Sequence, residues 1–265
     1  MPHATSRPPD DAAVPLRVAL LPTELAATPE PALDLVILID VLRTTTTVPI
    51  LFDGGLSRVR LSPSLRLARR LAAEDGDLLV GERRGVPPEG FNHGNSPATL
   101  QHRDLTGQNA TLVSENAPAA LPSLAEAREL VLASFVNAGA VVRHAADPRW
   151  RRIDLVCCGF RGTPDLDDLA VAGLLADRLQ RVRTDLVAVG ATRMAIDLVR
   201  LHADPLPLLL ASRAGRYLRD LGLDRDVGVA VDLDRSDAVP RMGPPERREG
   251  GTVYPFLPAA SDGPA

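Results

Sequence analysis

Short, nearly continuous apolar runs alternate with amphipathic segments along most of this chain, and this alternation limits the fold more than any other feature. Runs of Val, Ile and Leu without polar interruption are typical of strands buried on both faces. Strands that alternate with helices indicate a mostly parallel sheet covered by helices on both sides. We therefore predict a three-layer α/β/α fold. The predicted strands are Val18–Leu21, Leu35–Asp40, Val59–Leu61, Leu78–Gly81, Thr111–Ser114, Leu130–Ser134 and Ile153–Cys157.

Apolar residues at helical spacing mark the segments between and after these strands. One predicted helix begins with Ser62 as its N-cap and Pro63 as its first residue, and Leu65, Ala68 and Leu71 continue on one face. The other predicted helices are Asp165–Arg181, Ala188–His202 and Leu208–Leu221.

The two ends of the chain differ from this pattern. Met1–Pro15 is rich in Pro and poor in large apolar residues, which favours a disordered tail. Asp237–Gly251 contains several Pro and Gly residues and is predicted to be an exposed loop before a short segment at Thr252–Phe256. Because no internal repeat or linker divides the rest, we predict a single α/β domain over residues 16–265.

The charged residues exclude several classes of function. The chain has 34 acidic and 30 basic residues, and its net charge of −4 argues against a nucleic-acid-binding surface. All of the basic residues are Arg, so Schiff-base chemistry and a P-loop nucleotide site are excluded. Any cationic contact to an anion must come from Arg, from backbone N–H groups or from a metal ion. The arginines on predicted strand-end loops are Arg43, Arg83, Arg84 and Arg161.

The two cysteines, Cys157 and Cys158, are neighbours, so they cannot form an ordinary loop-closing disulfide and lack the paired spacing of a zinc site. The first residues have no apolar core of a signal peptide. No run reaches the about 18 apolar residues that span a membrane. We expect a cytoplasmic protein without a membrane segment.

In parallel sheets, ligands bind beyond the carboxyl ends of the strands, so the residues after each predicted strand are candidate site residues. Asp40 follows the Leu35–Ile39 run, and Arg43 and four Thr residues (Thr44–Thr47, including Thr45 and Thr46) come next, at a helix start. A helix N-terminus and an Arg suit a phosphate or sulfonate, and Asp40 could hold a divalent cation beside it. The alternative is that a Thr caps the helix and Asp40 pairs with Arg43.

The loop after Leu78–Gly81 begins with Glu82 and Arg83 and extends to Asn95 and Ser96, a length that is usually functional or disordered. Ser96 is equally suited to be an N-cap before Pro97. His93, in the same loop, is expected to be an exposed side chain. Asn137, which follows the Leu130–Ser134 strand, is a candidate ligand or a simple helix cap.

Asp165, Asp167 and Asp168 follow the Ile153–Cys157 strand at the start of the next helix. Acidic residues stabilise a helix N-terminus, but three exceed what one cap needs, so a second set of cation ligands is the alternative. Together, the strand-end residues predict a site for a small anion and a hard cation such as Mg²⁺, which takes few carboxylates plus water and substrate oxygens.

Three other hydrolase chemistries do not fit. A cysteine phosphatase needs Arg six residues after Cys, where Pro164 and Thr163 stand instead. In the Asp-x-Asp-x-Thr pattern of haloacid-dehalogenase-type phosphatases, Leu42 replaces the acid that protonates the leaving group. No Gly-x-Ser-x-Gly elbow occurs.

Several segments in order match a known family. They are Ile39–Thr47, Gly81–Arg83, Gly90–Pro97, Ala133–Asn137 and Cys158–Gly159 followed by Leu166–Asp168 and Ala172–Gly173. On these segments, which span about Val18 to Leu233, the chain resembles the 2-phosphosulfolactate phosphatase family of coenzyme M biosynthesis. The resemblance implies an α/β/α fold and Mg²⁺-dependent hydrolysis of a phosphate monoester on a three-carbon sulfonate acid.

The chain departs from the family pattern at three places. Where the family usually has Asn-Gly-Thr, this chain has Ser114-Glu115-Asn116-Ala117-Pro118, which introduces a carboxylate. Asn92 replaces a usual Asp, and Asp167 replaces the Glu of a Glu-Asp pair. Added negative charge beside an anion site weakens the binding of a multiply charged substrate.

We therefore predict a Mg²⁺-dependent phosphatase acting on 2-phosphosulfolactate. The predicted catalytic residues are Asp40, Arg43, Glu82 and Asp168; the predicted metal ligands are Asp40, Asp167 and Asp168; and the predicted substrate-binding residues are Thr45, Thr46, Arg83, Asn95, Ser96 and Asn137. The alternatives are a phosphatase for another small phosphorylated acid and an anion-binding module that has lost turnover. The sequence leaves the oligomeric state open, a homodimer included.

Overall fold

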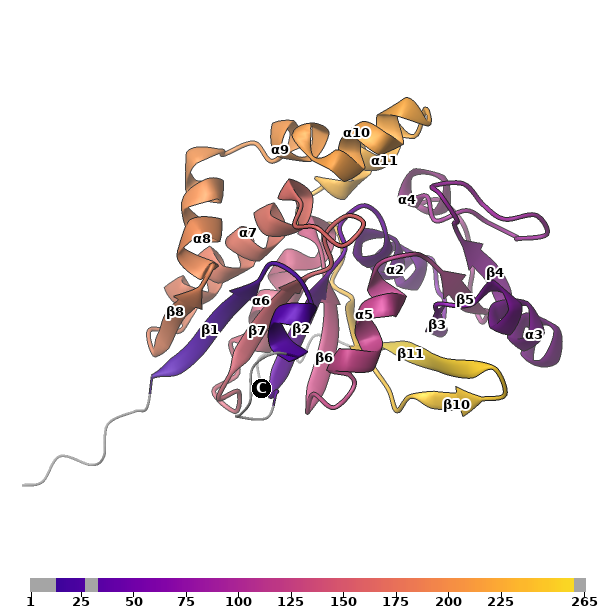
Figure 1. Cartoon of the computed structure of the whole chain (residues 1–265), viewed down its shortest axis with the longest axis horizontal. Coiled ribbons are helices and arrows are strands. Elements are labelled where there is room, and N and C mark those ends of the chain that lie inside the picture. Colours follow the sequence, from indigo (N-terminus) through magenta and orange to yellow (C-terminus); the bar gives the residue numbers. More distant parts are fainter. Residues whose placement is uncertain (1–12, 27–32, 260–265) are drawn as a thin grey trace, which may run out of the picture.

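The computed structural model describes residues 13–26 and 33–259. Within these residues the strands form one 11-stranded sheet with the order β4-β5-β3-β11-β9-β6-β2-β7-β1-β8, and β10 pairs with β11 (Figure 1). The strands are β1 (Val14–Ala19), β2 (Leu35–Ile39), β3 (Arg58–Ser62), β4 (Leu78–Gly81), β5 (Asn109–Val113), β6 (Glu129–Ala133), β7 (Ile153–Cys157), β8 (Leu186–Gly190), β9 (Val239–Met242), β10 (Glu246–Arg248) and β11 (Gly251–Ala259).

The helices connect these strands, and four of them follow one another between β8 and β9. They are α1 (Thr23–Ala26), α2 (Thr44–Asp53), α3 (Leu65–Asp75), α4 (Pro97–Leu100), α5 (Ala117–Leu124), the 3₁₀ helix η1 (Phe135–Asn137), α6 (Ala138–Ala145), α7 (Leu166–Val182), α8 (Thr192–Leu201), α9 (Leu206–Ala211), α10 (Arg213–Asp220) and α11 (Asp224–Ala230). The part of the chain that the structure describes contains no helix long and apolar enough to cross a bilayer.

The sheet consists of two parallel groups joined by antiparallel strands. β6, β2, β7, β1 and β8 are parallel neighbours, and so are β3, β5 and β4. Between the groups, β11 pairs antiparallel with β3 and with β9, and β9 pairs antiparallel with β6. The predicted α/β fold with a mostly parallel sheet is confirmed, with the two groups meeting at strands from the end of the chain.

Strand β2 shows why the molecule has helices on both faces of its sheet. Leu35, Ile37 and Ile39 belong to a core with residues of α6, α7 and α8, whereas Val36 and Leu38 belong to a core with residues of α2 and α5. All five β2 side chains are fully buried. A strand covered on both faces needs the continuous apolar run that the sequence shows.

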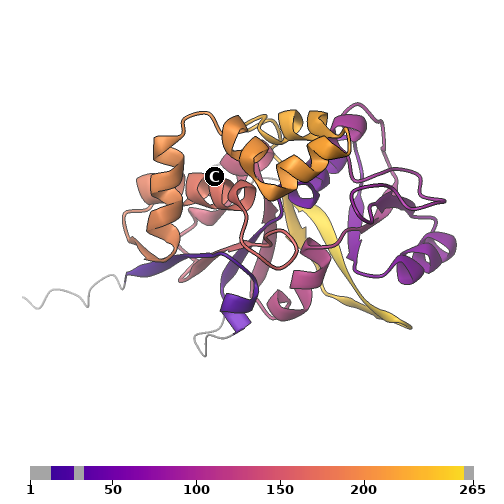
Figure 2. The same ribbon diagram turned by 45° about the horizontal axis from the view of Figure 1, so that its top comes forward.

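The three last helices lie over one end of the strands. In Figures 1 and 2, α9, α10 and α11 extend from the α7–α8 side of the sheet toward α4. The contacts of α9 and α10 with α7, and of α11 with α4, agree with this placement. These helices therefore connect the two parallel groups at the strand ends.

The predicted strands are present, Leu78–Gly81 and Ile153–Cys157 with the predicted bounds and the others with shifted ends, but several other predictions were wrong. Ser64, not Ser62, caps α3, and it accepts the Leu67 N–H at 3.2 Å. The predicted Ala188–His202 helix begins instead at Thr192, because its first residues form the edge strand β8. The predicted Leu208–Leu221 helix is divided at Ser212, whose extended backbone ends α9 and caps α10.

The predictions for the chain ends also needed correction. Val14 and Pro15, placed in the predicted tail, belong to β1, and Met1–Ala12 lie outside the described residues. Asp237–Gly251 is not an exposed loop, because it contains β9 and β10. Its partner β11 follows within the same part of the chain, but its other partner, β6, is distant, with Val131 opposite Arg241.

Candidate active site

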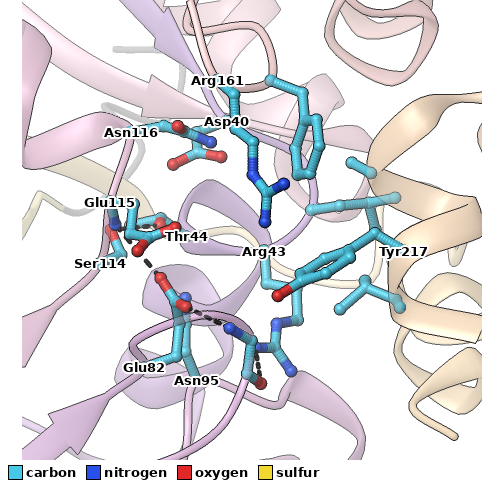
Figure 3. Close-up of a pocket in the computed structure, with 15 residues that line it drawn as sticks. Asp40, Arg43, Thr44, Glu82, Asn95, Ser114, Glu115, Asn116, Arg161 and Tyr217 are labelled. Carbon is cyan, nitrogen blue, oxygen red and sulfur yellow. Dashed lines mark hydrogen bonds between the residues drawn. The ribbon is translucent and has the colours of Figure 1, made fainter. Parts of the chain in front are cut away.

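A pocket lies where the carboxyl ends of β2, β4, β5 and β7 face α10 (Figure 3). It is lined by Asp40, Leu42, Arg43, Thr44, Glu82, Gly85, Asn95, Ser114, Glu115, Asn116, Phe160, Arg161, Ala214, Tyr217 and Leu218. The structure thus brings together Asp40, Arg43, Glu82 and Asn95 from the residues predicted to form the site.

Asp40 is the first residue after β2 and is almost completely buried. Its Oδ2 accepts a hydrogen bond from the Ala117 N–H at 3.0 Å, and its own N–H donates to Thr45 Oγ1 at 3.0 Å. Burial raises the pKa of Asp40 to about 6, and the nearby Glu82 carboxylate acts in the same direction. Such a pKa suits a carboxyl group that exchanges protons near neutral pH.

Arg43 directly precedes α2 and follows a cis Leu42–Arg43 peptide bond. It does not pair with Asp40, which was one sequence-based alternative. Its Nη1 instead lies 2.8 Å from Asp226 Oδ2, and its Nη2 donates to the Gly85 carbonyl at 2.8 Å. Since a guanidinium carries five N–H donors, these two contacts hold the group while leaving others for a ligand.

Asp226 holds Arg43 in place, and no sequence pattern pointed to it. This residue of α11 is 1% exposed, and its Oδ1 accepts hydrogen bonds from Ser96 Oγ at 2.6 Å and the Ala98 N–H at 3.2 Å. It lies far along the chain from any predicted strand end. Asp226 follows two exposed charged residues, Asp224 and Arg225, so the local sequence gives no signal that it will be buried.

Glu82 follows β4 and joins two loops of the pocket. Its Oε2 accepts the Gly85 N–H at 2.7 Å, and its Oε1 accepts the Glu115 N–H at 3.2 Å. Burial raises the pKa of Glu82. The contacts tie the loop after β4 to the loop after β5 beside Asp40.

The Thr residues of α2 divide into a pocket residue and supporting ones. Thr44 lines the pocket, with its Oγ1 2.9 Å from Ser114 Oγ. Thr45 and Thr46, predicted to bind substrate, are fully buried, and Thr46 Oγ1 donates to the Val41 carbonyl at 2.8 Å. Their hydroxyl groups shape the turn between β2 and α2 and do not line the pocket.

Asp167 and Asp168, in the first turn of α7, are buried behind Asp40. Asp168 accepts the Val41 N–H at 2.9 Å through Oδ1 and the Gly159 N–H at 2.8 Å through Oδ2. Asp167 Oδ1 is buried without a hydrogen-bond partner among the described residues. Burial, together with the Asp165 and Asp40 carboxylates, raises the pKa of Asp167 to about 8.

These carboxylates fit a cation to which the protein contributes few ligands. Over residues 13–26 and 33–259, no group of three or more His, Cys, Asp or Glu side chains is arranged to hold a metal ion. Asp40 and Asp167 are, however, two buried acids with raised pKa values; the Asp40 carboxylate helps to raise the pKa of Asp167, and Asp167 has an unpartnered oxygen. Mg²⁺ commonly takes one or two carboxylates and completes its shell with water and substrate phosphate.

The model of the 2-phosphosulpholactate phosphatase family matches residues 21–244. The chain belongs to this family. A probable 2-phosphosulfolactate phosphatase of Deinococcus radiodurans is 35% identical over 90% of this chain and 97% of its own length. A protein of the same description from Thermus thermophilus is 35% identical over 85% of this chain and 93% of its own length. One from Thermotoga maritima is 34% identical over 78% and 88%.

The segment that departs from the 2-phosphosulfolactate phosphatase pattern lies in the site. Ser114, Glu115 and Asn116 all line the pocket, and Glu115 is exposed there. Asn92, a second departure, accepts the Leu79 N–H at 2.8 Å and does not line the pocket. The added carboxylate of Glu115 therefore faces the same space as Asp40.

Other predicted residues support the pocket of this family member without lining it. Arg83 donates to the carbonyls of Ser114 and Pro63, at 3.2 and 2.5 Å. Ser96 precedes Pro97 at the start of α4, as the cap prediction has it, but its hydroxyl binds Asp226. Asn95 does line the pocket, and its buried Oδ1 lacks a partner among the described residues.

Asn137 lies away from the pocket. Its Oδ1 accepts the Ser134 N–H at 2.9 Å, and its Nδ2 donates to the carbonyls of Leu132 and Ala238 at 3.1 and 3.0 Å. It is fully buried at the end of η1. The side chain therefore joins β6 to the segment before β9 and has a structural role. The sequence offered two alternatives for Asn137, a ligand contact and a helix cap, and the structure is closer to the cap.

Proposed function

We propose that this protein is a phosphatase that hydrolyses 2-phosphosulfolactate to sulfolactate and inorganic phosphate with the help of Mg²⁺. The observation that carries the proposal is the convergence of Asp40, Arg43, Glu82 and Asn95 in one pocket of a chain that belongs to the 2-phosphosulfolactate phosphatase family. The relatives' names supply the substrate, and the pocket supplies groups suited to phosphoryl transfer.

Arg43 binds the phosphoryl group in this proposal. Its guanidinium is held by Asp226 and Gly85, so it meets the substrate in one preset orientation. Charge that is already in place lowers the barrier to phosphoryl transfer because no reorganisation is needed during the reaction. Thr44 and Asn95 also line the pocket, and the unpartnered Asn95 Oδ1 is an acceptor for a bound water.

Asp40 is the central carboxylate of the site. Its buried position at the end of β2 and the hydrogen bond from Ala117 fix the group toward the pocket. Two routes fit this arrangement: Asp40 accepts the proton of an attacking water, or it attacks phosphorus itself. Glu82 is a second carboxylate of the pocket, and it holds together the loops after β4 and β5.

Asp40 and Asp167 would hold the Mg²⁺ ion, and Asp168 would support them by binding the Val41 and Gly159 N–H groups. When bound, Mg²⁺ neutralises charge on the phosphoryl oxygens. It would also relieve the repulsion between the two buried acids.

Phosphate release from 2-phosphosulfolactate, measured with Mg²⁺ and again after chelation, tests the proposal. We expect turnover that depends on Mg²⁺ and an Asp40→Asn variant that loses about 10²–10⁴-fold in kcat. Asp104→Asn is the control, since Asp104 is an exposed loop residue outside the pocket. Full activity in Asp40→Asn would remove Asp40 from the mechanism, and turnover unchanged by chelation would remove the metal.

A second candidate function is the hydrolysis of another small phosphorylated acid, favoured by the Glu115 carboxylate in the pocket. Glu115 repels a substrate with many negative charges, so a less charged acid would bind better. A panel of phosphorylated three-carbon acids with and without a sulfonate separates the two functions. Tight anion binding with no phosphate release from any of them would identify an anion-binding module instead.

A further inference from the structure

We propose that Arg161 binds the anionic group of the substrate that is not transferred, its sulfonate or carboxylate. The inference rests on the proposed phosphatase function and names a specificity residue for it. It starts from the charges of the pocket. Two arginines, Arg43 and Arg161, are among the described residues that line it.

The two arginines have different partners. Arg43 is 5% exposed, forms an ion pair with Asp226 and lies at the base of the pocket. Arg161 is exposed, and no carboxylate lies within ion-pair distance of it in residues 13–26 and 33–259. Its positive charge is therefore not neutralised by the protein. In a pocket that also contains Asp40, Glu82 and Glu115, such a cation is the group on which an additional anion can bind.

Aromatic rings hold the Arg161 guanidinium in place. Its Cζ lies 4.9 Å from the centre of the Tyr217 ring and 5.0 Å from that of Phe160. The two rings contact each other, and the Tyr217 hydroxyl donates to the Arg84 carbonyl at 2.8 Å. Contacts with ring faces orient a guanidinium and leave its charge and in-plane N–H groups free for an anion.

The backbone places Arg161 at the tip of a tight turn. Phe160 and Thr163 exchange hydrogen bonds of 2.9 and 3.2 Å, and Arg161 and Gly162 between them have φ values of 51° and 75°. Positive φ at both central residues is the pattern of a type I′ turn. Arg213 of α10 donates to the Phe160 carbonyl at 2.8 Å, which anchors the turn to the helix.

The position of Arg161 in the pocket suits the sulfonate or carboxylate of the substrate and not the phosphoryl group. Figure 3 shows its side chain entering the pocket on the side of Tyr217, opposite Glu82 and Asn95. Arg161, Glu115 and Asn116 also line a second hollow beside Cys158. A phosphoryl group bound at Asp40 and Arg43 leaves the other charged end of a three-carbon acid toward this outer, exposed cation.

Kinetics of Arg161→Met with four phosphate esters test the inference. They are 2-phosphosulfolactate, 2-phospholactate without the sulfonate, the phosphate ester of 2-hydroxyethanesulfonate without the carboxylate, and phenyl phosphate with neither. We expect KM for 2-phosphosulfolactate to rise roughly 10- to 100-fold with little change in kcat, as for the loss of a charged hydrogen-bonded contact. A KM rise with 2-phospholactate would identify the carboxylate as the bound group, and a KM rise with the sulfonate ester would identify the sulfonate. The KM for phenyl phosphate should not change.

Arg84→Met is the matched control. Arg84 is also an exposed arginine, with a φ of 54°, and it lies next to the pocket without lining it. The substitution therefore makes the same change in charge on the same kind of backbone. An equal KM rise in both variants would mean that only net charge matters, and a KM rise with phenyl phosphate would place the transferred group on Arg161. Either result overturns the inference.

Calorimetric binding of sulfolactate separates this inference from the phosphatase proposal. If the wild-type chain releases no phosphate from any ester, the phosphatase proposal fails. Sulfolactate should nevertheless bind the wild-type protein and Arg84→Met alike, and bind Arg161→Met roughly 10- to 100-fold more weakly. Equal binding by Arg161→Met, or no binding by the wild-type protein, would refute the role of Arg161.

Discussion

Arg43 and Asp226 form a buried ion pair, with Nη1 2.8 Å from Oδ2 and side chains that are 4% and 1% exposed. The pair joins the start of α2 to α11, two elements that lie 183 residues apart in the sequence. Asp226 also accepts hydrogen bonds from the Ser96 hydroxyl and the Ala98 N–H at the start of α4. One carboxylate therefore holds an arginine of the pocket and two of the elements around it.

Asp226→Asn should leave the Arg43 charge buried without a counterion. Removing one partner of such a pair typically lowers the free energy of unfolding by about 3–5 kcal/mol. We expect a loss of this size in urea unfolding, together with reduced phosphatase activity. Asp224→Asn is the control on the same helix, because Asp224 is exposed, and it should change stability by no more than about 0.5 kcal/mol. Equal stability of the two variants would contradict the importance of the pair.

Asp167→Asn and Asp168→Asn should have opposite effects on the metal-free protein. Asp167 has a buried, unpartnered oxygen, and burial raises its pKa to about 8, so folding at pH 7 must protonate an acid that is ionised in the unfolded chain; removing this acid should raise the thermal midpoint at pH 7 in the presence of a chelator. Asp168 accepts two N–H groups, and an amide can accept only one of them, so its replacement should cost about 1–3 kcal/mol.

Both variants should also be titrated with Mg²⁺ by calorimetry. Asp167→Asn should bind the ion more weakly than the wild-type protein, because it removes a proposed ligand. The prediction is contradicted if Asp167→Asn is less stable than the wild-type protein without metal and binds Mg²⁺ equally well. Asp167 would then not be a metal ligand.

Gly173→Ala tests the close packing of α7 on α8. A Cβ at Gly173 would lie 2.1 Å from the Ala195 carbonyl oxygen, so the two helices would have to separate. We expect a loss of about 1–3 kcal/mol in unfolding free energy. Gly228→Ala, in α11, meets no atom within 4 Å and should stabilise the protein by about 0.5–1 kcal/mol. The prediction is wrong if both substitutions change stability in the same direction.

Asp75→Asn should reduce stability only at higher pH. The hydrogen bond from Arg60 lowers the pKa of Asp75 below its ordinary value of 3.8. The pair therefore contributes stability above pH 3.8, and this contribution disappears as the pH falls through the lower folded-state pKa. Because Asp75 is partly exposed, the contribution at pH 7 should be no more than about 1 kcal/mol.

Urea unfolding of the wild-type protein and Asp75→Asn between pH 2 and pH 7 measures this difference. Glu74→Gln is the neighbouring control, because Glu74 is more exposed and lies 3.6 Å from Arg70. A stability difference for Asp75→Asn that persists at pH 2 would assign the effect to something other than the charge of Asp75.

The local sequence was sufficient for the parts of this protein that depend on neighbouring residues. The uninterrupted apolar run of β2 predicted a strand buried on both faces, and Asp40 and Glu82 were found because they directly follow strands. The helix α7 was predicted almost to its ends because its apolar spacing is regular over 17 residues. Strand ends meet at one place in such sheets, so position along the chain already indicated a site.

Only the tertiary structure decided which of these side chains face the pocket and which hold it together. Tyr217 lines the site from α10 and Asp226 holds Arg43 from α11, both in segments without a local signal, while Thr45, Asp168 and Asn137 turn to backbone groups. Likewise, β9 is a strand because β6 and β11 supply its partners. Hydrogen-bond partners, burial and ion pairs between distant residues form only when the chain is folded, so no pattern of neighbouring residues encodes them visibly.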